Sequence, residues 1–265
     1  MSKIKRFFKQ NSHTSFFKVL AGFGRSLNRF YENRNHDVHS NGELTILRKL
    51  SKLKPAIVID GGANIGSYSL HVNSIIPECK IYSFEPVKST FQKLKLNTEK
   101  VANIFPVNMG FYKENCTKEI NIFNSDTHSS LYNIQGLSYT ANEKAEIALI
   151  CGDDFIKDNK IDKIDFLKLD IEGAEFDAFQ GFLHGIKEAK IRMIQFEYGY
   201  INITTKNLLA DFYSFFEANG YIIGKIFPKN VEFRKYAFKY EDFLGPNYIA
   251  VHKSDTVLIE LLRKK

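Results

Sequence analysis

The sequence has few cysteines and no long apolar run, and both features restrict the class of protein. Its three cysteines, Cys79, Cys116 and Cys151, are widely and irregularly spaced. This spacing predicts neither a disulfide framework nor a cysteine metal site, and it favours a reducing compartment such as the cytoplasm. No apolar stretch approaches the roughly 20 residues that a membrane-spanning helix needs. A secretory signal is a poor fit, because charges interrupt the N-terminal apolar residues.

Acidic residues are absent from the first 31 positions. Seven lysines and arginines precede Glu32, the first acid, and they account for the whole net charge of +7. They are mixed with aromatic and aliphatic residues, a composition typical of a basic amphipathic helix or helix pair. We therefore expect residues 1–40 to form a basic amphipathic helical extension and residues 41–265 to form the main domain.

Three roles stay open for residues 1–31. Basic and aromatic side chains suit a peripheral contact with an anionic membrane surface, which would make the protein membrane-peripheral. Alternatively, the helices pack on the main domain, or they form a homodimer. Nucleic acid is not an expected partner, because no nucleic-acid-binding motif accompanies the positive charge.

Strand-like and helix-like segments alternate along most of the main domain. Apolar runs of strand length, separated by amphipathic segments of helical length, occur at 56–60, 80–85, 101–108, 164–169 and 191–196. This alternation predicts an α/β protein with a mostly parallel sheet and ligands at the carboxyl ends of its strands. Two final strands, at 221–227 and 248–252, are expected to be antiparallel neighbours, which makes seven strands in all.

Residues 110–151 interrupt this alternation. Two β-like runs, 119–123 and 145–150, flank a Ser/Asn/Thr-rich segment at 124–130. We expect an inserted β-hairpin with a mobile loop in this part of the chain.

The stretch AIVIDGGANIG, residues 56–66, is the most informative part of the main domain. A short apolar run that ends in Asp60 and several glycines predicts a buried strand, a tight turn and the start of a helix. Glycines let the backbone approach a ligand closely at the helix N-terminus. This turn is therefore the expected cofactor site.

Two classes of cofactor suit such a turn. A dinucleotide site requires G-x-G-x-x-G, but Ala63 occupies the second glycine position and Asp60 would repel a pyrophosphate. S-adenosylmethionine carries an ammonium and a sulfonium, which a carboxylate favours. Glu85 ends the next strand-like run, where a carboxylate suits the ribose hydroxyls of an adenosine. The pattern favours a methyl-donor site, with a nicotinamide-dependent oxidoreductase as the alternative.

A second acidic block follows the strand at 164–169. Asp170 ends the strand, Glu172 lies two residues further on, and Glu175 begins a helix. Lys168 shares the side of the strand with Asp170, by the two-residue period. Clustered carboxylates raise one another's pKa, which favours a general base for methyl transfer to a hydroxyl.

The motifs VIDGGANIGSYSL, FEP, GDDF, FLKLDIEGAEFDAFQG and QFE, in this order and spacing, resemble those of the FkbM family of S-adenosylmethionine-dependent methyltransferases. The resemblance covers residues 42–197. It implies a Rossmann-like class I methyltransferase fold and O-methylation, commonly of sugar hydroxyls. The expected acceptor is a glycan, a lipopolysaccharide or capsule precursor, or a glycosylated natural product. A methyltransferase-like protein without activity, serving at a membrane surface or in an assembly, is the non-enzymatic alternative.

The resemblance also assigns residues by position. The candidate donor-binding residues, completed by Asn108 at the end of the third strand, are Asp60, Gly61, Gly62, Asn64, Gly66, Glu85, Asn108 and Asp153. The candidate catalytic residues are Asp170, Glu172 and Glu197. The chain departs from the family pattern at Gly152, where an apolar residue is usual, and after Asn108, where MGFYKEN replaces small residues.

Three interpretations of the acidic block stay open. Asp170 or Glu172 is the base, or Asp170, Glu172 and Glu197 bind a divalent cation such as magnesium that holds a vicinal diol. In the third, Glu172 and Glu175 only cap the following helix and pair with Lys168.

Four further residues are weaker candidates. His36 and His39 flank Asp37 with a spacing that suggests a metal, but both are interpreted as surface residues. His128 either contacts the acceptor or is a solvated loop histidine. Glu43 either lies over the donor site or begins a helix.

Overall fold

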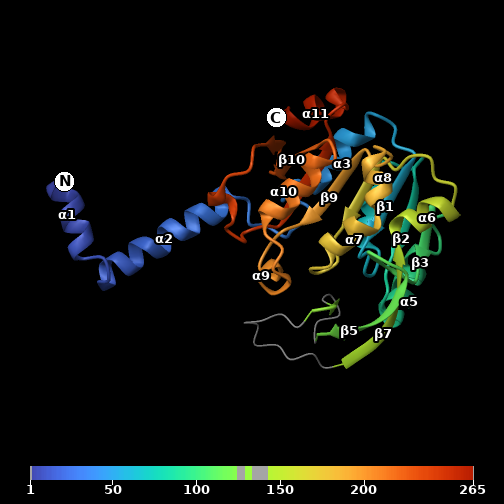
Figure 1. Ribbon diagram of the computed structural model, residues 1–265, viewed down its shortest axis with the longest axis horizontal. Coiled ribbons are helices and arrows are strands. Elements are labelled where there is room, and N and C mark those ends of the chain that lie inside the picture. The colour runs from blue at the N-terminus through green and yellow to red at the C-terminus, as the bar shows by residue number, and fades with distance from the viewer. Residues whose placement is uncertain (1, 124–128, 133–142, 265) are drawn as a thin grey trace.

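The computed structural model describes residues 2–123, 129–132 and 143–264 (Figure 1). Its helices are α1 Lys3–Gln10, α2 Ser15–Tyr31, α3 Glu43–Ser51, α4 Ser67–Ile75, α5 Lys88–Thr98, α6 Gly152–Asp158, α7 Glu175–Gly181, α8 Leu183–Lys187, α9 Ile201–Thr205, α10 Leu209–Ala218 and α11 Thr256–Arg263. Its strands are β1 Ile57–Gly61, β2 Lys80–Phe84, β3 Ile104–Val107, β4 Gly110–Tyr112, β5 Cys116–Ile122, β6 Ser129–Ser130, β7 Glu143–Cys151, β8 Phe166–Leu169, β9 Met193–Glu197, β10 Tyr221–Ile226, β11 Val231–Phe233 and β12 Asn247–His252.

The main sheet confirms the expected Rossmann-like α/β fold. Its strand order is β11-β10-β12-β9-β8-β1-β2-β3, and β3, β2, β1, β8 and β9 pair in parallel. The strand β12 is antiparallel to both β9 and β10, as expected for the two final strands. The expected number of seven strands is wrong: among the described residues the sheet has eight, because Val231–Phe233, between the two final predicted strands, also pairs with β10.

The two faces of the sheet are covered by different helices, because successive strand residues point to opposite sides. Ile59 of β1 and Leu167 of β8 face α6, α7, α8 and α10, with which they form one apolar core. Val58 of β1 and Phe166 of β8 face α3, α4 and α11 in a second core. Figure 1 shows this layered arrangement.

The described residues of the insertion form a second sheet of four strands, in the order β4-β7-β5-β6. The strands β5 and β7 are antiparallel, which confirms the expected hairpin. Val87, Tyr112, Ile120, Ile147 and Leu149 form its small core. Of the segment 124–130, expected to be a mobile loop, residues 124–128 lie outside the described part of the chain.

The helices α1 and α2 project away from the domain (Figure 1), and neither has a buried residue. Contact with the domain begins at the end of α2. Glu32 Oε2 lies 3.1 Å from Lys225 Nζ, and Asn33 Nδ2 donates to the Ile226 carbonyl at 3.0 Å. In the part of the chain that the structure describes, no helix is long and apolar enough to cross a membrane.

Candidate active site

The turn after β1 is held between β2 and β8. The Gly62 and Ala63 N–H groups donate to the Phe84 carbonyl at 3.0 and 2.8 Å. Gly62 has a φ of +83°, and a Cβ there would lie 1.9 Å from the Asp170 carbonyl oxygen. Any other residue would push β1 and β8 apart at their carboxyl ends, so glycine is required. Gly66, with a φ of +92°, then begins α4.

Glu85 joins this turn to the end of β2. Its carboxylate accepts from the Asn64 N–H at 3.1 Å and from the Val87 N–H at 2.9 Å. Asn108 Nδ2 donates to the Glu85 and Pro86 carbonyls, so Asn108 supports the loop that carries Glu85. Burial raises the pKa of Glu85 to about 7, although both hydrogen bonds oppose this shift.

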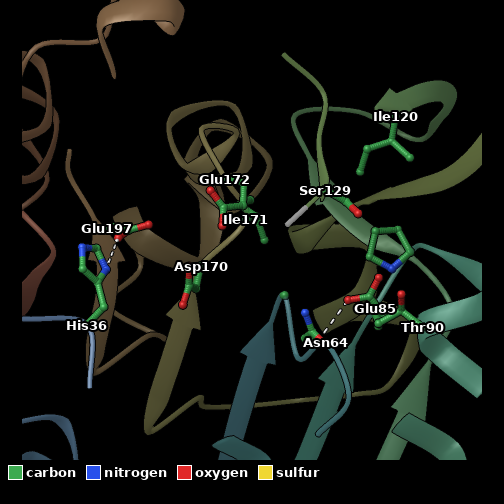
Figure 2. Close-up of a pocket in the computed structure, with 12 residues that line it drawn as sticks. His36, Asn64, Glu85, Thr90, Ile120, Ser129, Asp170, Ile171, Glu172 and Glu197 are labelled. Carbon is green, nitrogen blue, oxygen red and sulfur yellow. Dashed lines mark hydrogen bonds and ion pairs between the residues drawn. The ribbon is translucent and has the colours of Figure 1, made fainter. Parts of the chain in front are cut away.

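A pocket of about 400 Å³ lies at the carboxyl ends of the parallel strands. It is lined by His36, Gly62, Asn64, Glu85, Pro86, Thr90, Ile120, Ser129, Asp170, Ile171, Glu172 and Glu197. Figure 2 shows Asn64, Glu85 and Thr90 on one side and His36 and Glu197 on the other. The structure thus brings together six of the predicted site residues at the carboxyl ends of β1, β2, β8 and β9: Gly62, Asn64, Glu85, Asp170, Glu172 and Glu197.

One side of the pocket is strongly acidic. Burial, and then the neighbouring Asp170 and Glu175, raise the pKa of Glu172 to about 8. Burial, reinforced by Asp170 and Glu172, also raises the pKa of Glu197 well above its ordinary value. None of the described residues that line the pocket is a lysine or an arginine. The site therefore favours a cationic ligand, whose charge would compensate these carboxylates.

A buried polar network lies beneath the pocket. Lys168 Nζ is 2.8 Å from Asp170 Oδ2, which confirms that the two side chains share one side of β8. Burial opposes the charge of Lys168, but Asp170, Asp60 and Glu43 together raise its pKa. Glu43 accepts from Gln195 and Asn247 at 2.8 and 3.1 Å, and so belongs to this network and does not line the pocket.

Asp60 also lies in this network. Its side chain is fully buried, and Oδ2 accepts from the Ser69 hydroxyl at 2.6 Å. Oδ1 has no hydrogen-bond partner among the described residues. Burial raises the pKa of Asp60, while Lys168 and Ser69 lower it. The side chain thus lies below the turn, so any effect on a ligand passes through the turn and not through direct contact.

Asp153 lies away from the pocket. Its carboxylate accepts from the His184 and Gly185 N–H groups at 2.7 and 2.8 Å, which ties α6 to α8. The neighbouring Gly152 departs from the family pattern for a steric reason: a Cβ there would lie 2.4 Å from the Phe182 ring. Glu175 is also outside the lining, and its Oε1 accepts from the Ile171 and Gly173 N–H groups in the loop.

Sequence reasoning missed several lining residues. His36, interpreted as a surface residue, is exposed, but its Nδ1 lies 3.5 Å from Glu197 Oε1 at the pocket. Ser129 comes from the insertion, and the next residue, Ser130, donates its hydroxyl to the Glu172 carbonyl at 2.7 Å. His39 lies outside the pocket, against the ring of His71 at 5.1 Å. His128 is outside the described residues.

A cation site finds no support in this geometry. Among residues 2–123, 129–132 and 143–264, no group of three or more His, Cys, Asp and Glu side chains is arranged to hold a metal ion. Asp170 is instead paired with Lys168, which supplies the compensating positive charge.

Comparison with known proteins identifies the class. The family described as "Methyltransferase FkbM domain" matches residues 60–223, and the chain belongs to this family of methyltransferases. This assignment confirms the resemblance to that family.

Individual relatives are distant. Methyltransferase 1 of Beauveria bassiana (strain ARSEF 2860) is 24% identical in an alignment of 144 positions that covers 48% of this chain and 58% of that protein. Among solved structures, a methyltransferase FkbM from Methylobacillus flagellatus KT has a TM-score of 0.48 at 19% identity, covering 74% of this chain and 44% of its own. Aeropyrum pernix fibrillarin, solved with S-adenosyl-L-methionine, has a TM-score of 0.40 at 12% identity, covering 85% and 74%. The chain thus spans less than two thirds of the first two proteins.

Proposed function

We propose that this methyltransferase uses S-adenosylmethionine and methylates a hydroxyl oxygen of a saccharide. The observation that carries the proposal is the acidic pocket at the strand ends, with Glu85 on one side and Glu172 and Glu197 on the other. A ligand with a sulfonium and an ammonium suits such a pocket, whereas the pyrophosphate of a nicotinamide dinucleotide would meet four carboxylates and no lysine or arginine among the described lining residues.

The residues fit the parts of this donor in turn. Glu85 has carboxylate lone pairs left after its two backbone hydrogen bonds, so it can accept from two ribose hydroxyls. The glycine turn at Gly62 gives the donor close access to the backbone. When bound, S-adenosylmethionine supplies an electrophilic methyl group on sulfur and is left as a neutral thioether.

The acceptor oxygen must lose a proton as it bonds to the methyl carbon. Glu172 and Glu197 face the pocket with raised pKa values, and each can take that proton as a general base once ionised. The nearby positive charge of the donor favours their ionised form. His36, beside Glu197, can orient that carboxylate or hydrogen-bond the acceptor. Most of the remaining rate enhancement would come from holding the two reactants in line.

The test uses donor labelled on its methyl group and a mixture of saccharide precursors. We expect the label on a sugar oxygen with the wild type and no incorporation with the double variant Glu172→Gln/Glu197→Gln, which removes both candidate bases. Glu78→Gln, which alters an exposed carboxylate outside the pocket, is the matched control and should stay active. Label found on nitrogen or carbon, or none with any saccharide, would contradict the proposal.

A further inference from the structure

The N-terminal arm, defined as α1 and α2 (residues 3–31), has an apolar face that nothing in the described structure covers. Neither helix has a buried residue. Large apolar side chains on them are between 46% and 83% exposed, and these are Ile4, Phe7, Phe8, Phe16, Val19, Leu20, Phe23, Leu27, Phe30 and Tyr31. Exposure of this extent along two helices indicates a binding surface.

The apolar and charged residues of α2 lie on opposite faces. At about 100° per residue, Phe16, Phe23 and Phe30 fall on one side of the helix, together with Leu20 and Leu27. Lys18, Arg25 and Arg29 fall on the other side. A face of aromatic and aliphatic residues opposed by lysine and arginine is the pattern of helices that lie in a membrane interface.

The two helices of the arm contact each other, and the residue that follows the arm is attached to the domain. The Phe8 ring packs against Phe17 at 5.0 Å, which joins α1 to α2. At the other end, Glu32 pairs with Lys225 and with Arg234 of the domain. Figure 1 shows the arm extending from this base away from the sheet.

We propose that the N-terminal arm binds the surface of an anionic lipid bilayer. The arm carries all of the chain's net charge of +7 and no acid, so negatively charged headgroups complement it. Association with the arm of a second copy would bring cations together without any acid to pair them. Because its apolar and basic residues are on opposite faces, α2 lies along the surface over about 25 Å, with its phenyl rings among the acyl chains.

The test is a flotation assay of the full-length protein with phosphatidylcholine vesicles, with and without phosphatidylglycerol. We expect binding only to the vesicles that contain phosphatidylglycerol, weakening as salt is added. The triple variant Lys18→Gln/Arg25→Gln/Arg29→Gln should bind roughly 100-fold more weakly, since each basic residue near an anionic surface contributes about 1 kcal/mol. The variant Phe23→Ser/Phe30→Ser should bind at least roughly tenfold more weakly.

Matched controls remove the same number of positive charges and of large apolar side chains from the domain. Lys95→Gln/Lys100→Gln/Lys157→Gln and Phe238→Ser/Val257→Ser alter exposed side chains outside the arm and should bind as the wild type does. All variants should unfold at the wild-type temperature, because the altered arm residues are not buried.

Three results would overturn the proposal: wild type that stays unbound with anionic vesicles, equal binding to neutral vesicles, or controls that lose as much binding as the arm variants. A wild-type dimer in light scattering that Phe23→Ser/Phe30→Ser converts to monomer would assign the face to a second copy instead. None of these readouts depends on methyl transfer.

Discussion

His36 Nδ1 lies 3.5 Å from Glu197 Oε1, so the segment that follows the N-terminal arm reaches the carboxyl end of β9. The family match covers residues 60–223, and His36 lies outside it. This part of the pocket is therefore supplied by residues beyond the matched region.

His36→Gln should lower kcat/KM for the acceptor by roughly two- to fivefold, because His36 is mostly exposed and such an ion pair contributes about 0.5–1 kcal/mol. Donor affinity should change less than kcat/KM for the acceptor, since Glu85 and Asn64 are on the other side of the pocket. His39→Gln is the matched control, as His39 is also exposed but lies outside the lining. Equal losses in the two variants would argue against a role for His36.

Glu85→Gln should weaken donor binding by roughly tenfold to a hundredfold, because charged hydrogen bonds to the ribose are lost. Asp153→Asn should leave donor affinity unchanged and lower the unfolding temperature, because its carboxylate accepts from two N–H groups of α8. Calorimetric titration with the donor measures the affinity of both variants, and thermal unfolding measures the stability of Asp153→Asn. Weakened donor binding by Asp153→Asn alone would restore the role that the family resemblance assigns to Asp153.

Donor binding near pH 7 should release roughly one to one and a half protons. In the free protein burial raises the pKa of Glu172 to about 8 and that of Glu85 to about 7, so at this pH Glu172 is mostly protonated and Glu85 is half protonated. A cationic ligand favours the ionised carboxylates and lowers these pKa values. Calorimetry in buffers of different ionisation enthalpy measures the released protons, and Glu172→Gln should reduce their number. Proton uptake on binding would contradict the proposed electrostatics.

The unliganded protein should lose stability as pH rises from about 4.5 to 8. Burial is the main cause that raises the pKa of Glu85 and Glu175 to about 7 and of Glu172 to about 8, above the ordinary value of 4.5. The folded state therefore binds more protons than the unfolded state in this range. Denaturant titrations at several pH values in this range measure the free energy of unfolding. This free energy should fall less steeply with pH in Glu172→Gln than in the wild type, and an equally steep fall would count against a buried, protonated Glu172.

Local patterns predicted the parts of the site that neighbouring residues define. The turn at Gly62 and the carboxylate of Glu85 follow from a strand, its glycines and the end of the next strand. The alternation of side chains along a strand explains why Asp60 lies below the pocket. Asp60 shares a face of β1 with Val58, and Lys168 shares a face of β8 with Phe166, both toward α3.

Long-range packing determines what the sequence could not indicate. His36 reaches the pocket only because Glu32 and Asn33 attach the end of α2 to β10. Ser129 reaches it because the insertion folds back and Ser130 bonds to the Glu172 carbonyl. The strand β11 has only three residues, too few for a two-residue period to be recognised.

The most direct test is a structure of the protein crystallised with S-adenosylmethionine. The account predicts the ribose hydroxyls within hydrogen-bonding distance of the Glu85 carboxylate, and the sulfonium on the side of Asp170, Glu172 and Glu197. A pocket without donor at saturating concentration, or a donor bound away from Glu85, would contradict the proposed site.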